Sequence, residues 1–162
     1  MSEQITAQRD ARANGLNGQA DRRAGSRGDN MRRFGPVDPV DGPKAVGGYT
    51  QGFAVPPGSG LLFVSGQIPV DVEGSLPFGF EAQCRQAWRN LVTVLRAADL
   101  RIENLVKVTT FLSDRKYADI NAEVRRGLLG EHRPALTVIV ADIFDGGWLL
   151  EIEAVAAIPP QG

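Results

Sequence analysis

The stretch that organises this 162-residue chain is Leu149–Leu150–Glu151–Ile152–Glu153–Ala154–Val155–Ala156. It predicts a β-strand, and the alternation places Glu151 and Glu153 on one face, roughly 6.6 Å apart along the strand. A carboxylate buried in a sheet is costly unless it is paired, hydrogen-bonded or used in chemistry. The strand expected just before it, at 134–140, carries no cation that could pair with either group. The role of the two carboxylates is therefore the main functional question.

The composition indicates one ordinary folded domain. The chain is 43% hydrophobic, which supplies a core, and its net charge of -1 lacks the basic excess typical of nucleic-acid binders. Its single cysteine, Cys84, excludes an internal disulfide and fits a reducing cytoplasm. No segment approaches the roughly 20 apolar residues of a membrane span, and no apolar secretion signal opens the chain. We therefore expect a cytoplasmic protein with neither a nucleic-acid nor a membrane partner.

Three regions differ in composition. Residues 1–30 contain no aromatic residue and few large aliphatic ones, so we expect a disordered extension, with Met31 as an alternative start. Residues 31–45 predict an irregular arm, because proline and glycine recur there. Residues 46–162 hold the folded domain.

Hydrophobic periodicity predicts an α+β fold with one sheet and both helices on one of its faces. The first two strands flank a proline- and glycine-rich turn, so we expect them to pair as a hairpin. The order of elements is β-β-α-β-α-β-β. We expect strands at 49–55, 61–67, 106–112, 136–142 and 149–157, and helices at 79–100 and 117–129.

This layout leaves one face of the sheet without helices. An exposed apolar sheet face usually signals self-association, so we expect a trimer or a dimer rather than a monomer. The apolar residues expected on that face are Leu62, Val64, Val108 or their neighbours, and Ile152.

Residue counts exclude several enzyme classes. One histidine, His132, and one cysteine, Cys84, cannot supply the ligands of a zinc deaminase, and the sequence shows no other cluster of metal ligands. A hydrolytic triad is disfavoured because His132 is the only imidazole. The sequence has neither a Gly-x-Ser-x-Gly elbow nor a phosphate-binding glycine loop. Cys84 falls on the apolar stripe of the first helix, where a packed thiol is expected. We expect no metal and no cofactor.

Two interpretations of the glutamate pair follow from the residues alone. Their spacing is compatible with a glycosidase pair, although the chain shows no aromatic residues arranged to stack on sugars. Alternatively, one glutamate hydrogen-bonds the backbone or pairs with Lys107 while the other faces solvent. Both stay open at this point.

Five segments form a specific combination: Gly-Tyr-Thr-Gln-Gly at 48–52, Leu-Phe-Val-Ser-Gly-Gln-Ile-Pro-Val at 62–70, Val-Lys-Val-Thr-Thr-Phe-Leu at 106–112, Glu-His-Arg-Pro-Ala at 131–135 and Glu-Ile-Glu-Ala-Val-Ala at 151–156. Together they resemble the YjgF-type Rid family of reactive-intermediate enamine/imine deaminases. The resemblance implies a chorismate-mutase-like fold and a homotrimer with sheets packed into a central barrel and clefts between subunits. It also implies cofactor-free hydrolysis of small 2-enamine or 2-imine acids to 2-keto acids and ammonia.

The same resemblance assigns candidate site residues. Glu151 matches the glutamate that handles the attacking water, and Tyr49 matches the tyrosine that closes the cleft. Ser65 matches a serine lining the site, and Asn121 a polar residue on the second helix. These residues are the expected catalytic group and substrate contacts.

One family feature is replaced in this chain. Leu136 stands where the resemblance places a carboxylate-binding arginine, and Val138 stands where it places a small thiol-bearing residue. Leucine cannot provide the charge-assisted, often bidentate contact that arginine gives a carboxylate. Arg133, three residues earlier on a loop, is the remaining candidate cation near this strand. The pocket is therefore expected to suit a less acidic or more apolar molecule.

Three functions remain to be compared. Retention of Glu151 and Tyr49 favours an imine or enamine hydrolase over the alternative, a non-catalytic trimer that binds a small metabolite or acts as a chaperone-like protein. A ribonuclease is disfavoured, because the chain lacks a histidine pair and a basic groove.

Overall fold

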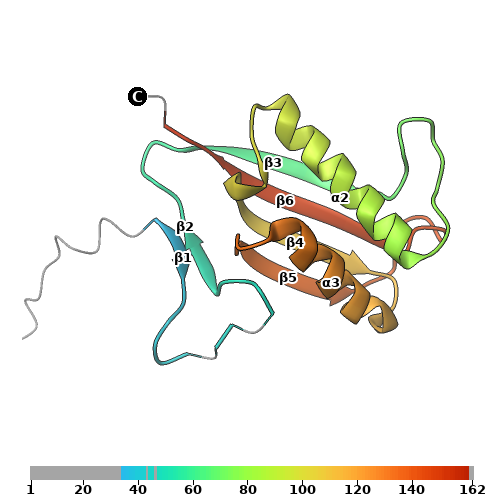
Figure 1. Cartoon of the computed structure of the whole chain (residues 1–162), viewed down its shortest axis with the longest axis horizontal. Coiled ribbons are helices and arrows are strands. Elements are labelled where there is room, and N and C mark those ends of the chain that lie inside the picture. Colours follow the sequence, from blue (N-terminus) through green and yellow to red (C-terminus); the bar gives the residue numbers. More distant parts are fainter. Residues whose placement is uncertain (1–33, 43, 46, 161–162) are drawn as a thin grey trace, which may run out of the picture. The chain divides into compact units, whose positions relative to one another are not determined.

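The computed structural model describes residues 34–42, 44–45 and 47–160; the extension predicted over 1–30 lies outside them. A four-stranded sheet has the order β3-β6-β4-β5 (Figure 1). Its central strands β6 (Leu150–Ile158) and β4 (Leu105–Leu112) are antiparallel. The edge strands are β3 (Gly60–Gln67), antiparallel to β6, and β5 (Ala135–Val140), parallel to β4.

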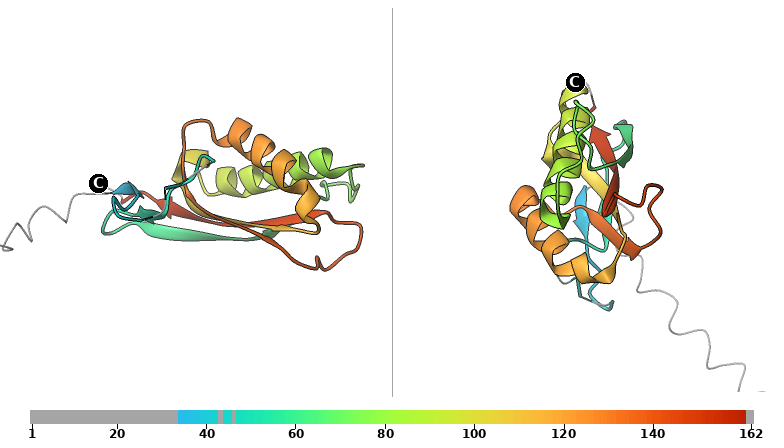
Figure 2. Two further views of the ribbon diagram at one scale, coloured as in Figure 1. Left: turned by 90° about the horizontal axis from the view of Figure 1, so that it is seen from below. Right: turned by 90° about the vertical axis from the view of Figure 1, so that its right-hand side faces the viewer.

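Both helices cover the same face of this sheet (Figures 1 and 2). Helix α2 (Phe80–Ala97) lies over β3 and β6, and α3 (Ala118–Leu129) lies over β4 and β5. Single 3-10 turns, η1 (Ile102–Asn104) and η2 (Arg115–Tyr117), lead into β4 and α3. The predicted α+β fold, with two helices on one face of the main sheet, is confirmed, although the two short strands that precede β3 form a separate two-stranded sheet. Within the described ranges neither helix has the length and apolar character that crossing a membrane requires.

The core lies between α2 and the sheet. Trp88, Leu91 and Leu95 project from one side of α2 and are fully buried. They belong to the same cluster as Val108 and Ile152 of the central strands, which are also fully buried. The apolar residues that recur every three or four positions on α2 thus pack against the apolar residues that alternate along the central strands.

Truncating this core should destabilise the fold strongly. We expect Leu91→Ala to lower the free energy of unfolding by about 2–5 kcal/mol, because it removes buried methyl groups and leaves a cavity. Val72→Ala is the control, since Val72 is 94% exposed and should change stability by less than about 0.5 kcal/mol. Urea denaturation followed by circular dichroism measures both values. Equal midpoints for the two variants would contradict this description of the core.

The hairpin predicted between the first two strands is wrong. Strand β2 (Gly52–Ala54) pairs antiparallel with β1 (Gly35–Val37), a strand inside the predicted irregular arm, whereas β3 pairs with β6. A carboxylate of the arm supports this pairing: Asp38 Oδ1 accepts hydrogen bonds from Thr50 Oγ1 at 3.0 Å and from the Gln51 amide at 2.7 Å. Such long-range partners leave no local periodic signal in the sequence.

The open face of the sheet, opposite the helices, carries a different apolar set from the one predicted. Leu61 and Phe63 of β3 are 45% and 73% exposed there, and Ile139 of β5 is 44% exposed. On β3 the neighbours of the named residues lie on the open face, because successive residues of a strand point to opposite faces of a sheet. The core side instead contains Leu62, Val64, Val108 and Ile152.

Candidate active site

Glu151 lies on the open face near the start of β6, and its carboxylate occupies the space over Gly66 of β3. A Cβ atom on Gly66 would stand 1.6 Å from Glu151 Oε1 and 2.6 Å from its Cδ. Gly66 falls where the pairing of β3 with β6 shifts register, between Val64 and Gln67. The missing side chain of Gly66 and the register shift together leave the space that the half-buried carboxylate of Glu151 occupies.

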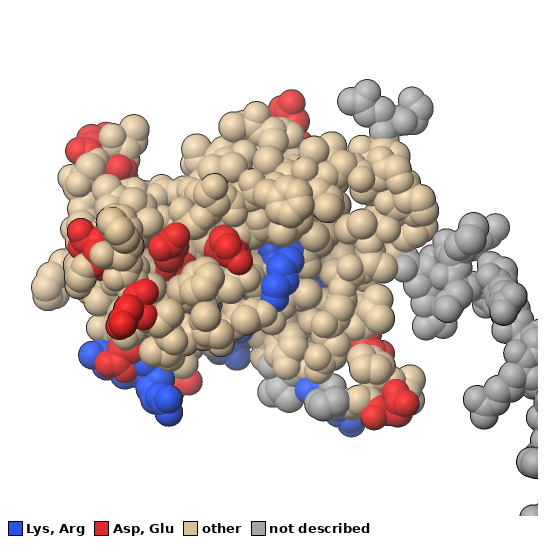
Figure 3. All heavy atoms as spheres, turned by 180° about the vertical axis from the view of Figure 1, so that it is seen from behind, with Lys and Arg blue, Asp and Glu red and all other residues tan. Residues whose placement is uncertain are grey.

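The neighbouring part of the open face is a hollow of about 280 Å³. Its lining combines apolar residues such as Phe63 with the polar residues Ser65, Lys107, Thr109 and Glu153. Acidic and basic side chains lie next to one another near the middle of this face (Figure 3). Lys107 Nζ donates to Thr137 Oγ1, and burial lowers the pKa of Lys107, an effect that the nearby Glu153 opposes. The ion pairs of the described residues involve neither glutamate of β6. Glu153 is exposed, whereas Glu151 is half-buried with its carboxylate over Gly66.

Leu136 and Val138 lie on the opposite face of the sheet from Glu151. Their register with Val108 and Thr110 of β4, both buried under the helices, turns them toward the helix side. Leu136 packs against the core, and Val138, on the free edge of the sheet, is 41% exposed. Arg133 is exposed in the loop before β5.

Asn121 is buried between the helices, with 1% of its surface exposed. Its Oδ1 accepts a hydrogen bond from the Sγ of Cys84 on α2 at 3.9 Å. Tyr49 is half-buried just before Thr50, whose amide donates to the carbonyl of Pro134 at 3.3 Å. Tyr49 therefore lies beside the beginning of β5.

Cys84 is a packed thiol, as expected from the apolar stripe of its helix. It is fully buried, and this burial raises the pKa of the thiol to about 12, against the weaker influence of Arg85 and Arg125. In the unfolded chain the thiol ionises from about pH 9, so the folded state holds the extra proton between pH 9 and 12. This contribution to stability is complete below pH 9 and is lost as the pH rises.

The measurable consequence is alkaline destabilisation. Between pH 9 and 10.5 we expect the free energy of unfolding to fall more steeply in the wild type than in Cys84→Ala, by on the order of 1 kcal/mol per pH unit. Urea titrations at several pH values give the two slopes. The comparison uses slopes because Cys84→Ala also leaves a small cavity. Parallel slopes would show that Cys84 ionises equally in both states.

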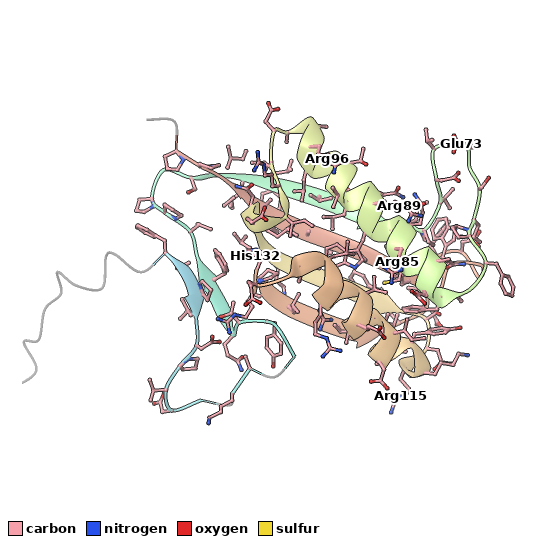
Figure 4. All side chains as sticks on the ribbon, in the orientation of Figure 1. Glu73, Arg85, Arg89, Arg96, Arg115 and His132 are labelled. Carbon is pink, nitrogen blue, oxygen red and sulfur yellow. The ribbon has the colours of Figure 1, made fainter. Side chains whose placement is uncertain are left out.

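His132 has a structural setting. Its Nε2 lies 2.7 Å from the carbonyl oxygen of Leu105, and its ring meets that of Phe53 edge-on, with the centroids 6.0 Å apart. It sits between the end of α3 and β2 (Figure 4). Across the described part of the chain, no three His, Cys, Asp or Glu residues gather in a way that could hold a metal ion.

The predicted site residues fall into two groups. Glu151 and Ser65 share the open face, and Gly66, whose role the sequence analysis missed, lies with them. The second group lies at the β5–α3 edge and on its helix side. Glu151 is opposite Phe111 of β4, whereas the beginning of β5 is opposite Lys107 of the same strand. These two positions on β4 are four residues apart, so Glu151 and the beginning of β5 are separated by about 13 Å along the strand direction. One chain does not bring the groups together. The second group comprises Tyr49, Asn121, Leu136 and Val138.

Comparisons with known proteins bear on this arrangement. The family model described as Endoribonuclease L-PSP matches residues 40–158. RutC family protein PH0854 of Pyrococcus horikoshii is 36% identical over 117 residues, which cover 70% of this chain and 90% of that protein. The 2-iminobutanoate/2-iminopropanoate deaminase of Escherichia coli is 33% identical over 119 residues, covering 70% and 90% of the two chains.

Solved structures share the fold. The Rid family protein YyfB from Yersinia pestis superimposes with a TM-score of 0.68 at 24% identity, covering 76% of this chain and 97% of its own. Escherichia coli TdcF with bound serine gives a TM-score of 0.59 at 29% identity, covering 80% and 95%. The resemblance read from the five sequence segments is thus confirmed. The chain belongs to the Endoribonuclease L-PSP family, which includes the Rid and RutC proteins.

Proposed function

We propose that this protein is a cofactor-independent deaminase that hydrolyses the C=N bond of a small 2-imino acid, formed directly or from its enamine. The observation that carries the proposal is the position of Glu151. Its half-buried carboxylate lies over Gly66 and has no ion-pair partner among the described residues. A carboxylate fixed in this way is suited to orient a water molecule and to move its proton. The deaminase named among the relatives supports the same chemistry. The single buried cysteine leads us to expect that it acts in the cytoplasm.

The proposed site is a cleft between two copies of the chain in a homotrimer. The open face of one copy supplies Glu151 and Ser65, and the β5–α3 edge of the next supplies Tyr49 and Val138. Two findings support this division. The two groups are separated within one chain, and the open face exposes apolar side chains such as Phe63, which a neighbouring copy would bury.

The reaction moves two protons, each by way of Glu151, and needs no redox step. The oxygen of water bonds to C2 of the imine while Glu151 accepts a proton from that water, and the same proton passes to the imine nitrogen to give a carbinolamine. Glu151 then takes the hydroxyl proton and delivers it to the amine. The C–N bond breaks, its electron pair leaves with nitrogen as ammonia, and C2 becomes a carbonyl. Imine and water thus yield a 2-keto acid and ammonia.

The test is to generate 2-iminobutanoate in situ and to follow its loss and the release of 2-oxobutanoate with and without the protein. We expect the protein to accelerate both in proportion to its concentration. Heat-denatured protein is the control for non-specific amine or carboxylate catalysis. Loss at the rate of buffer alone would overturn the proposal.

A binding protein without turnover is the second candidate. Leu136 favours it, because β5 offers no cation to a carboxylate at that position, and a neighbour of the same fold was solved with bound serine. This candidate predicts saturable binding of 2-oxobutanoate together with an unchanged rate of imine loss.

A further inference from the structure

Arg125 of α3 is a buried cation that has no anionic partner in the part of the chain that the structure describes. Only 6% of its surface is exposed, and its Nε is buried with no hydrogen-bond partner. Its Nη2 donates to the carbonyl of Gly47 at 3.3 Å, a long hydrogen bond. The ion pairs found among the described residues, Arg85 with Glu81 and Lys116 with Asp114, do not include it.

Such a group is expensive in a folded chain. Removing a charge from water is costly unless an opposite charge and satisfied hydrogen bonds compensate for it. Burial lowers the pKa of Arg125, and the adjacent Arg126 acts in the same direction, opposed only by the weaker influence of Cys84. A guanidinium has five N–H donors arranged as a fork that matches a carboxylate. Arg125 therefore has a buried N–H donor for which the described residues supply neither an acceptor nor an anion.

Its position connects it with the β5–α3 half of the proposed cleft. Arg125 follows Asn121 by one helical turn, so the two side chains project from neighbouring positions on α3. The carbonyl that it contacts belongs to Gly47, two residues before Tyr49. Helix α3 overlies β4 and β5 (Figures 1 and 2). The register of β5 turns the uncharged Leu136 toward the helix side. A carboxylate in this half of the cleft thus finds a cation on the helix and none on the strand.

We propose that Arg125 binds the carboxylate of the ligand, a small 2-oxo or 2-imino monocarboxylic acid, in place of its weak bond to the Gly47 carbonyl. The choice of acid rests on the proposed function, whereas the requirement for an anion rests on the burial of Arg125. Gly47 and Gly48 have φ angles of 98° and 76°, which glycine tolerates and other residues rarely adopt. This backbone conformation presents the Gly47 carbonyl to the guanidinium.

The experiment titrates 2-oxobutanoate, a stable 2-oxo acid, into the full chain and follows binding by NMR. We expect Arg125→Gln to weaken binding about 10- to 100-fold, the value of a hydrogen bond to a charged group. Arg115→Gln is the charge-matched control, because Arg115 is exposed and points outward near the start of α3 (Figure 4). It should leave the affinity unchanged within about twofold. The neutral amide of 2-oxobutanoate should not discriminate between wild type and Arg125→Gln.

Equal affinity of wild type and Arg125→Gln for 2-oxobutanoate would overturn the inference, as would no binding to the wild type. If Arg125→Gln fails to fold, the Nε–H resonance of Arg125 in the wild type, assigned with Arg125→Lys, decides instead. It should move on saturation with 2-oxobutanoate, and an unmoved resonance overturns the inference. Arg125-dependent binding without imine hydrolysis would contradict only the proposed function. Imine hydrolysis with the same KM in Arg125→Gln would contradict only this inference.

Discussion

Glu151→Gln should lower kcat for imine hydrolysis by roughly 10²–10⁴-fold while the chain folds as the wild type does. Glutamine keeps the shape of the side chain and fits the same space over Gly66, but it cannot accept a proton from water. The loss is therefore expected in kcat rather than in the affinity for 2-oxobutanoate. Steady-state kinetics with 2-iminobutanoate generated in situ measure kcat, and circular dichroism checks the fold.

The matched control for this substitution is Glu153→Gln. Glu153 lies two residues further along the same strand and on the same face, but it is exposed and its carboxylate does not lie over a glycine. Its replacement should leave kcat within a few-fold of wild type. If Glu151→Gln retains full activity, or if both substitutions reduce kcat equally, Glu151 is not the group that moves the proton.

Gly66→Ala should lower kcat by about 100-fold with little change in stability. The new Cβ would stand 1.6 Å from Glu151 Oε1, so the carboxylate has to leave its position. A flexible side chain moves at small cost, and Gly66 is not among the glycines with a positive φ, so alanine fits the backbone. A displacement of about 1 Å at a reacting group is enough for a loss of this size. Kinetics and urea denaturation on the same preparation separate the two effects.

Gly127→Ala is the control for this second substitution. A Cβ on Gly127 meets no atom within 4 Å, and the residue lies inside α3, where alanine favours the helix by about 0.5–1 kcal/mol. This variant should be fully active and slightly more stable. Wild-type kcat in Gly66→Ala would show that the glycine does not position Glu151.

Much of the fold could be predicted because each element carries its own periodic signal. The apolar stripe that includes Cys84 identified α2, and alternation identified β4 and β6. The pairing of β1 with β2 could not be predicted, because it depends on Asp38 reaching Thr50 across the arm. Which residues of β3 lie on the open face could not be decided, since alternation alone does not say which face the helices cover.

The candidate site was predicted unevenly for a similar reason. Glu151 stood out as a carboxylate in an apolar strand, but the function of Gly66 depends on a register shift between two strands distant in sequence. Arg125 has the spacing of an ordinary helix residue, and its burial depends on tertiary packing, in which it contacts Gly47. Within one chain, Glu151 lies apart from Tyr49, which no motif reveals.

The division of the site between two copies can be measured by mixing two inactive variants. Glu151→Gln damages only the half-site on the open face, and Tyr49→Ala damages only the half-site beside β5. After dissociation and reassembly of an equal mixture, each cleft receives two intact halves with a probability of about one quarter in a closed ring. The account predicts that the mixture regains about a quarter of wild-type imine hydrolysis. Activity equal to the mean of the two variants assayed separately would contradict it.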